Sequence, residues 1–241
     1  MQSLIANTAQ LARALAVAPS ATDVWSQFKA FLDQHGFHHL SVLRVSDDLP
    51  HRVAGAVLYL DGPQGFAEEF DREQLGPHSP EITRALTTVT PFTSIETRAT
   101  VLTPEQRRVL QRINVTLNVR DGWTFPIHYC GQLRGIVMVG GLTPDMSHLL
   151  SATMHLLAHA AFRRVEELRF GTGVKGHSLT SREVECLRWV ALGKTDNEIA
   201  TIVGIGKRTV RFHVENVKRK LRVATRVQAV TEAIRQRAIA A

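Results

Sequence analysis

A segment near the C-terminus, residues 207–219, carries the side chains that proteins use to contact DNA. At about 100° per residue, one set of side chains falls opposite an apolar stripe: Arg208, Phe212, Glu215, Asn216 and Arg219, flanked by Thr209, Arg211, Lys218 and, just beyond this segment, Lys220. Arg and Asn on an exposed helix can form bidentate hydrogen bonds with guanine and adenine edges in the major groove. Lys and Arg at its margins suit phosphates. The segment is therefore interpreted as a DNA-reading helix.

The neighbouring segments favour the same interpretation. Three helix starts have a Thr followed three residues later by Glu or Gln, which is the capping-box pattern: Thr180 with Glu183, Thr195 with Glu198, and Thr225 with Gln228. Apolar residues recur at helical spacing behind each start. A short turn with Gly204 and Gly206 precedes the DNA-reading helix, as in a helix-turn-helix motif. The sequence thus predicts a compact C-terminal domain of four helices.

The positive charge of the chain is concentrated in this region. Residues 172–241 hold 14 Lys and Arg against 6 Asp and Glu, a net charge of +8, whereas the other 171 residues hold 15 against 16. A solvated basic surface is the plain alternative, because most charge clusters have no further role. The segregation of the charge favours a nucleic-acid interface instead.

The same region resembles the C-terminal domain of LuxR-type transcription factors. The blocks LTSRE, GKTDNEIA, GIGKRTVRFHVENVKRKL and TRVQAV match that family with fixed spacing. The resemblance implies a DNA-binding domain whose recognition helix begins near Lys207 and whose last helix takes part in dimerisation. Gly206 stands where the family usually has a Ser cap. Because glycine is an acceptable helix cap, the expectation of DNA binding is kept.

Length and composition fit a globular protein of two domains. The 241 residues are 44% hydrophobic and 21% charged, which is ample for a core. Cys130 and Cys186 fall in different predicted domains and indicate no disulfide framework. The first residues lack a signal-peptide pattern, and no apolar run approaches the roughly 18 residues of a membrane span. We expect a cytoplasmic protein without membrane contact.

The first 170 residues mix helical and strand-like patterns. Helices are expected before Pro19, over 24–36, around Phe66 and Phe70, over 80–88, from Thr103 onward and over 144–168; strands are expected over 40–45 and 53–60, with a hairpin of 122–129 and 132–139 around Cys130 and Gly131. Because hairpins connect the strands, we predict an α+β fold. It comprises an N-terminal α/β/α sandwich with an antiparallel sheet (1–170), a linker (171–177) and the C-terminal four-helix helix-turn-helix domain (178–241).

No catalytic or metal-binding set stands out in the sequence. His35, His38 and His39 are close together, and three imidazoles can hold a metal. No acidic or Cys cluster completes such a set, so a capping or surface role is favoured. No Ser lies in a Gly-x-Ser-x-Gly turn, and GTGVKG lacks the spacing of a phosphate loop. We expect no enzymatic activity, no metal and no cofactor other than a candidate small-molecule signal.

The N-terminal region resembles the quorum-sensing branch of the LuxR-type regulators, whose α/β/α sandwich binds an acyl-homoserine lactone between sheet and helices. The blocks GPHSPEITRALTTVTPF and RDGWTFPIHYCGQLRGIVMVGG carry this resemblance, and Gly122 matches a family glycine. Where the family has a Trp and a Tyr, an Asp before Pro, and a further Trp, this chain has Phe66 and Phe70, Ser79, and Ser94. These changes remove two hydrogen-bond donors and weaken an acceptor. The resemblance therefore implies a diverged site with these candidate residues: Tyr59, Phe66, Phe70, Ser79, Ser94 and Trp123.

Two interpretations of that site remain open. In the first, a cavity persists and takes a less polar small molecule than a standard acyl-homoserine lactone. In the second, Phe66 and Phe70 are core residues, Ser79 caps the helix that Pro80 begins, and side chains such as Trp123 fill the space. A standard acyl-homoserine lactone receptor is the least favoured of the three alternatives.

These observations predict a dimeric transcriptional regulator. It binds a two-fold related operator, one half-site per protomer, with the long helix before the linker as a dimer element. RNA polymerase is a further candidate partner. The alternative is an anti-activator that heterodimerises with a related regulator. A third hypothesis, an enzyme with a DNA-binding tail, requires a catalytic set that the sequence does not show.

Overall fold

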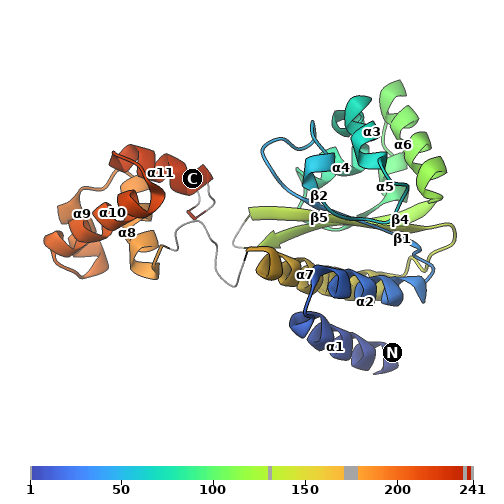
Figure 1. Ribbon diagram of the computed structural model, residues 1–241, viewed down its shortest axis with the longest axis horizontal. Coiled ribbons are helices and arrows are strands. Elements are labelled where there is room, and N and C mark those ends of the chain that lie inside the picture. The colour runs from blue at the N-terminus through green and yellow to red at the C-terminus, as the bar shows by residue number, and fades with distance from the viewer. Residues whose placement is uncertain (1, 130–131, 171–178, 236–237, 240–241) are drawn as a thin grey trace. The chain divides into compact units, whose positions relative to one another are not determined.

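The chain forms two compact units, Met1–Arg169 and Phe170–Ala241, and each is described by itself. The computed structural model describes residues 2–129, 132–170, 179–235 and 238–239 (Figure 1). The predicted hairpin turn at Cys130 and Gly131 and the predicted linker at 171–177 lie outside the described residues.

The first unit is built on a five-stranded sheet in which each neighbouring pair of strands is antiparallel. The spatial order is β2-β1-β5-β4-β3, so the long β4–β5 hairpin lies between the short edge strand β3 and the strand β1. The strands are β1 (His39–Arg44), β2 (Val57–Leu60), β3 (Phe92–Thr93), β4 (Asp121–Tyr129) and β5 (Gln132–Gly141).

Helices cover both faces of this sheet (Figure 1). One side holds α1 (Gln2–Val17), α2 (Ala21–Asp33) and α7 (His148–Phe170). The other side holds α3 (Phe66–Arg72), α4 (Pro80–Ala85), α5 (Ser94–Arg98) and α6 (Pro104–Leu117). Two short 3-10 turns, Ala54–Ala56 and Gly76–His78, complete the unit. The predicted α/β/α sandwich with an antiparallel sheet is confirmed.

The two faces of the sheet belong to different cores, because successive strand side chains point to opposite sides. Trp123, Phe125 and Ile127 of β4 pack into a first core with the aromatic residues of α2 and with Phe162 of α7. The second core lies on the side of α3–α6. It contains Leu43, Phe92 and Ile136 from the sheet and these helix and loop residues: Leu49, Val53, Ala56, Phe66, Phe70, Leu75, Ile82, Ala85 and Val109.

The second unit contains the four predicted helices around a small core of its own. They are α8 (Ser181–Ala191), α9 (Asp196–Val203), α10 (Lys207–Leu221) and α11 (Arg226–Arg235). The capping boxes at Thr180 and Thr195 are present in both directions. At the third start, Thr225 N–H donates to Gln228 Oε1 over 3.0 Å, and Gln228 N–H donates to Thr225 Oγ over 3.1 Å. All three predicted starts are confirmed.

The first unit differs from the predicted elements at several boundaries. Strand β2 begins at Val57 rather than at residue 53, because the preceding 3-10 turn is held by Asp71, whose carboxylate accepts from the N–H groups of Val53 and Ala54. Helix α4 ends at Ala85. The short α5 was not predicted, and it begins where Thr93 Oγ accepts from the Glu96 N–H over 2.9 Å.

Gly122 of β4 occupies a place that no side chain can share. A Cβ atom at this position would lie 2.1 Å from the backbone oxygen of Val139 on β5. Because backbone cannot yield as a flexible side chain does, we expect Gly122→Ala to lower the free energy of unfolding by about 3 kcal/mol. Gly55→Ala is the matched control, since nothing lies within 4 Å of its Cβ position. Urea unfolding of both variants checks this, and equal stabilities would contradict it.

Candidate functional site

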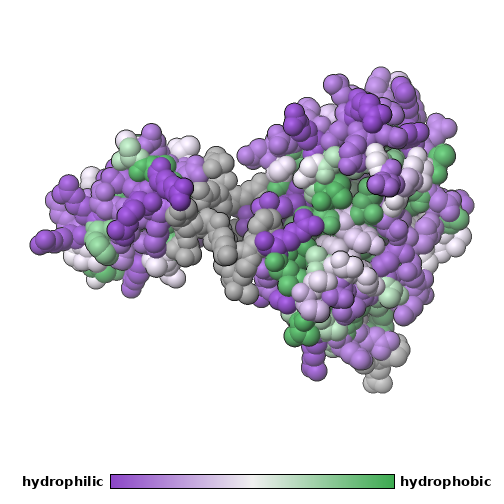
Figure 2. Space-filling view, viewed as in Figure 1, coloured by the Kyte–Doolittle hydropathy of each residue, from purple (hydrophilic) through white to green (hydrophobic). Residues whose placement is uncertain are grey.

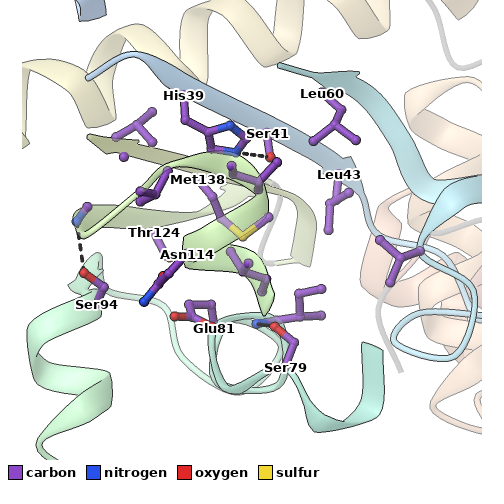
Figure 3. A pocket seen from close by; sticks show the side chains of 18 of the residues that line it. His39, Ser41, Leu43, Leu60, Ser79, Glu81, Ser94, Asn114, Thr124 and Met138 are labelled. Atoms are coloured by element: carbon purple, nitrogen blue, oxygen red, sulfur yellow. Dashed lines mark hydrogen bonds between the residues drawn. The ribbon is translucent and has the colours of Figure 1, made fainter. Parts of the chain in front are cut away.

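The first unit encloses a cavity on the side of the sheet covered by α3–α6 (Figure 3). It measures about 110 Å³ as the space open to the centre of a water-sized sphere. One water needs only about 10–15 Å³ by the same measure. Side chains therefore do not fill this space. Its walls are lined by His39, Ser41, Leu43, Val53, Val57, Leu60, Phe66, Ala67, Phe70, Ser79, Glu81, Ile82, Ser94, Ile113, Asn114, Leu117, Val119, Arg120, Gly122, Trp123, Thr124, Met138, Val139 and Gly140.

The sheet forms one wall of the cavity, and alternate strand residues supply its polar groups. His39, Ser41 and Leu43 of β1, Thr124 of β4 and Met138 of β5 belong to this wall. His39, Ser41 and Thr124 are buried, so polar side chains lie within a largely apolar enclosure. Such a site favours a ligand that is mostly hydrocarbon with a few polar atoms.

His39 and Ser41 form a hydrogen-bonded chain with a defined direction. Burial lowers the pKa of His39 to about 4, so its imidazole is neutral at neutral pH. Nδ1 lies 2.7 Å from the carbonyl oxygen of Asp61, which can only accept, so Nδ1 carries the proton. Nε2 therefore accepts from the Ser41 hydroxyl over 2.6 Å. Because the hydroxyl proton of Ser41 is used in this hydrogen bond, its Oγ can only act as an acceptor toward the cavity.

The helical wall contains four of the residues suggested by sequence, Phe66, Phe70, Ser79 and Ser94. Phe66 and Phe70 of α3 line the cavity and also belong to the second core, with ring centroids 5.8 Å apart. Ser79 lines the cavity and caps α4, because its Oγ accepts from the Ile82 N–H over 3.4 Å. Core packing and helix capping, which the sequence left as an alternative to a cavity, thus coexist with one.

Ser94 lines the cavity at the start of α5. Its Oγ accepts from the N–H of Gly122 over 2.9 Å, which joins α5 to β4. Because a hydroxyl can donate while it accepts, Ser94 keeps a donor that a ligand carbonyl could use. Its position follows from the capped start of α5, an element that the sequence did not predict.

Tyr59 is not among the residues that line the cavity, and Trp123 borders it. The ring of Tyr59 packs against Trp25 of α2, at 5.9 Å between centroids, on the side of the first core. The pairing of β1 with β2 shifts register between Val42 and Leu43. As a result, Val57 and Leu60 both line the cavity, while Tyr59, which pairs with Val42, faces the other side of the sheet. Trp123 borders the cavity, but its indole stacks on Phe125 within the first core. It therefore does not fill the space.

Glu81 is a cavity residue that the sequence analysis missed. It follows Pro80 at the start of α4, and its Oε2 atom is buried without a hydrogen-bond partner among the described residues. Burial raises the pKa of Glu81 to about 6, although a hydrogen bond from its own backbone and the charge of Arg98 both favour the ionised form. The available signal was its position between the buried Pro80 and Ile82, where a charged side chain is unusual.

Because Glu81 is buried, we expect the free energy of unfolding to depend on pH. Its pKa is raised in the folded chain relative to the usual 4.5, so ionisation opposes folding. The stability that Glu81 contributes is complete below about pH 4.5 and is lost as the pH rises through about 6. We expect Glu81→Gln to gain about 2 kcal/mol of unfolding free energy over the wild type between pH 4 and pH 7.5.

Urea unfolding of both full-length chains across this pH range measures that difference. The exposed Glu68 of α3 supplies the control, since Glu68→Gln removes the same charge at the surface. A stability difference between Glu81→Gln and the wild type that stays constant with pH would contradict the prediction.

In the second unit, α10 presents the predicted DNA-contacting residues on its outer face. Its apolar residues Val210, Val214, Val217 and Leu221 are buried. The residues exposed to solvent are Lys207, Arg208, Thr209, Arg211, Phe212, Glu215 and Arg219, while Asn216 and Lys218 are half-buried. The ring of Phe212 is 61% exposed, which is unusual for an aromatic side chain. The visible surface of this unit is mostly hydrophilic (Figure 2).

Several of these side chains are paired with one another along the helix. Arg219 Nη2 donates to Asn216 Oδ1 over 2.8 Å, and Lys218 Nζ lies 2.8 Å from Glu215 Oε1. Lys220 serves the fold instead, because its ammonium lies 2.6 Å from the buried carboxylate of Glu183 on α8. Among the described contacts, the cations at the start of this outer face of α10 have no ion-pair partner, whereas groups at its end are paired with one another. Lys220 does not belong to this face, because it pairs with Glu183.

The histidines near the end of α2 have structural contacts. His38 Nε2 lies 2.8 Å from the carbonyl oxygen of Asn118, and the ring of His35 packs against Phe31. Within the described part of the chain, no group of three or more His, Cys, Asp or Glu side chains could hold a metal ion. The helices of that same part include none that is long and apolar enough to cross a membrane.

Two family models match the two units. The model described as autoinducer binding domain matches residues 20–165, and the one described as bacterial regulatory proteins, luxR family, matches residues 177–233. The quorum sensing-dependent transcriptional regulator RpaR of Rhodopseudomonas palustris is 31% identical over 87% of this chain and 85% of its own. The transcriptional activator BjaR1 of Bradyrhizobium diazoefficiens is 27% identical over 93% of both chains.

Solved structures share the fold at low sequence identity. SdiA of Escherichia coli matches with a TM-score of 0.69 and 18% identity, over 96% of this chain and 97% of its own. A second SdiA structure, in complex with octanoyl-rac-glycerol, matches with a TM-score of 0.68 over 96% and 95%. The relatives are transcriptional regulators rather than enzymes. This chain therefore belongs to the quorum-sensing branch of the LuxR family of transcriptional regulators, with an autoinducer-binding domain followed by a helix-turn-helix domain.

Proposed function

We propose that the chain is a ligand-responsive regulator in which the cavity of residues 1–170 takes a small molecule and residues 178–241 bind operator DNA. The observation that carries the ligand part is the open cavity, which combines apolar walls with a few buried polar groups. A regulator that had lost its signal would be expected to fill this space, since empty volume costs stability.

In the proposed DNA complex, each predicted contact residue of α10 has a role of its own. Arg208, Asn216 and Arg219 read base edges, Glu215 accepts from cytosine, and Phe212 contacts a thymine methyl group. The groups that contact phosphates are Lys207, Thr209, Arg211 and Lys218. The net charge of +8 in residues 172–241 supports the phosphate contacts, because phosphate binding needs excess positive charge.

We further propose that the protein acts as a homodimer on a two-fold related operator, one half-site per protomer. Leu149 and Leu156 of α7 support this, because they lie seven residues apart on one helix face and are 48% and 59% exposed.

Because relatives such as BjaR1 are named transcriptional activators, RNA polymerase is proposed as a further partner. The alternative is an anti-activator that heterodimerises with a related regulator and does not bind DNA. In that case, the DNA binding tested below would be absent.

Arg208→Ala tests the recognition helix. Because Arg208 has no partner that would hold it to the protein among the described contacts, we expect the loss of one bidentate base contact. Discrimination at one base pair of each half-site should fall by about 1–3 kcal/mol. Lys218→Ala should instead weaken binding to all sequences. Titrations of operator variants measure both effects, with Arg182→Ala on α8 as a charge-matched control. Unchanged discrimination by Arg208→Ala would contradict the assignment.

A ligand panel tests the cavity. A molecule present at a hundred times its dissociation constant adds about 2.7 kcal/mol to the unfolding free energy, which raises Tm by several degrees. We expect such a shift, with a change in operator binding, from octanoyl-rac-glycerol or N-octanoyl-homoserine lactone. Met138→Trp, which places an indole on the sheet wall of the cavity, should abolish the shift and leave operator binding without ligand unchanged. A shift retained in Met138→Trp would contradict binding at this site.

A further inference from the structure

The described fold satisfies the carboxyl group of Glu81 only in part, through a hydrogen bond from the residue's own backbone. Its Oε2 is buried without a hydrogen-bond partner in the part of the chain that the structure describes, and the residue lines the cavity. A buried acceptor left unpaired opposes folding. The Oε2 atom is therefore suited to accept a hydrogen bond from a donor group of a ligand in the cavity.

Among the residues that the structure describes, no side chain provides a hydrogen-bond donor for Oε2 of Glu81. The nearby Ser79 oxygen is engaged with the Ile82 N–H as the cap of α4. In Figure 3, Glu81 lies with Asn114 and Ser94 at one end of the cavity, while Leu43 and Leu60 lie at the other. Glu81, Asn114 and Ser94 thus gather at one end of the cavity, and the other end is mainly apolar, with Ser41 beside Leu60.

The sheet wall adds an acceptor to this arrangement. Ser41 donates to His39 Nε2, so its oxygen offers only lone pairs to a ligand. Ser94, by contrast, accepts from the Gly122 N–H and keeps its own hydroxyl proton. At the Glu81 end, a complementary ligand therefore needs a donor for Glu81 and an acceptor such as a carbonyl for Ser94.

The remaining walls define the rest of the ligand. They consist mainly of aliphatic and aromatic side chains: Leu43, Val53, Val57, Leu60, Phe66, Phe70, Ile82, Ile113, Leu117 and Met138. Such walls favour a hydrocarbon chain, because its burial is driven by the loss of apolar surface from water.

We propose that Glu81 is the specificity-determining anchor of the cavity and that it selects an amphipathic acyl compound whose head group carries O–H or N–H donors. This assignment rests on the proposed function of the cavity as a ligand site. The Glu81 carboxylate accepts from the head-group donor, Ser94 donates to the acyl carbonyl, and the acyl chain extends toward Leu43 and Leu60.

Three probes with the same acyl chain and different heads test this assignment. They are 1-octanoyl-glycerol with hydroxyl donors, N-octanoyl-homoserine lactone with an amide N–H, and methyl octanoate with no donor. The affinity of each for the full-length chain is measured by calorimetry and by the shift in Tm. We expect the better donor probe to bind at least about tenfold more tightly than methyl octanoate, since hydrogen bonds to charged groups are worth about 1.5–3 kcal/mol.

Glu81→Leu removes the acceptor and retains a side chain of similar size. We expect this variant to fold, because it removes an unpaired buried carboxyl, and to lose the preference for donor probes by about tenfold or more. Its affinity for methyl octanoate should equal or exceed that of the wild type. Glu68→Gln, at an exposed site outside the cavity, should keep the wild-type preference.

The outcomes separate this inference from the proposed function. Binding of all three probes with equal affinity, or a preference that survives in Glu81→Leu, would overturn the role of Glu81 while the cavity remains a ligand site. Absence of any probe binding, with operator binding unchanged, would overturn the proposed ligand response and this inference with it. The two donor probes also distinguish a hydroxyl head from an amide head.

Discussion

The alternation of side chains across one antiparallel sheet governs the architecture of the first unit. In β4, Trp123 and Phe125 complete a solid core against α2 and α7, whereas Gly122 and Thr124 face the cavity. Neighbouring side chains of a strand point to opposite faces, so the large aromatic residues of β4 lie in the first core and its small residues lie at the cavity. The sheet thereby acts as a rigid support with its bulk on one side and a polar, partly empty surface on the other. The cavity depends on that division.

The sequence predicted the second unit more completely than the first, and the reason is the range of the interactions involved. Capping boxes and helical periodicity act within a few residues, so Thr180, Thr195 and Thr225 marked the helix starts correctly. The sandwich and its antiparallel sheet were also predictable from hairpins and helices. Which strand residues face the cavity depends on how the strands pair. The register shift beside Val42, which turns Tyr59 away from the cavity, arises from the pairing of β1 with β2 and not from the local sequence of β2. Glu81 was missed because its burial is created by distant elements.

The first unit combines stability and specificity in different residues. Its apolar cores provide the free energy of folding, while the polar groups of the cavity are held in place at some cost. His39 is kept neutral and fixed by the Asp61 carbonyl, and Glu81 Oε2 has no hydrogen-bond partner among the described residues. Residues that lower stability at no structural benefit are commonly found where a protein binds or reacts. The cavity of this regulator follows that relation.

The internal pairs on α10 have a consequence for how DNA sequences would be discriminated. In the free helix, Arg219 is bound to Asn216, and Lys218 lies against Glu215. If α10 enters the major groove as proposed, each contact made by these side chains replaces one that already exists. Binding is then an exchange reaction, in which the protein's own partner competes with the base. A mismatched base leaves the internal pair intact, so non-specific complexes can retain the side-chain conformations of the free protein and rearrangement occurs only at a matching site.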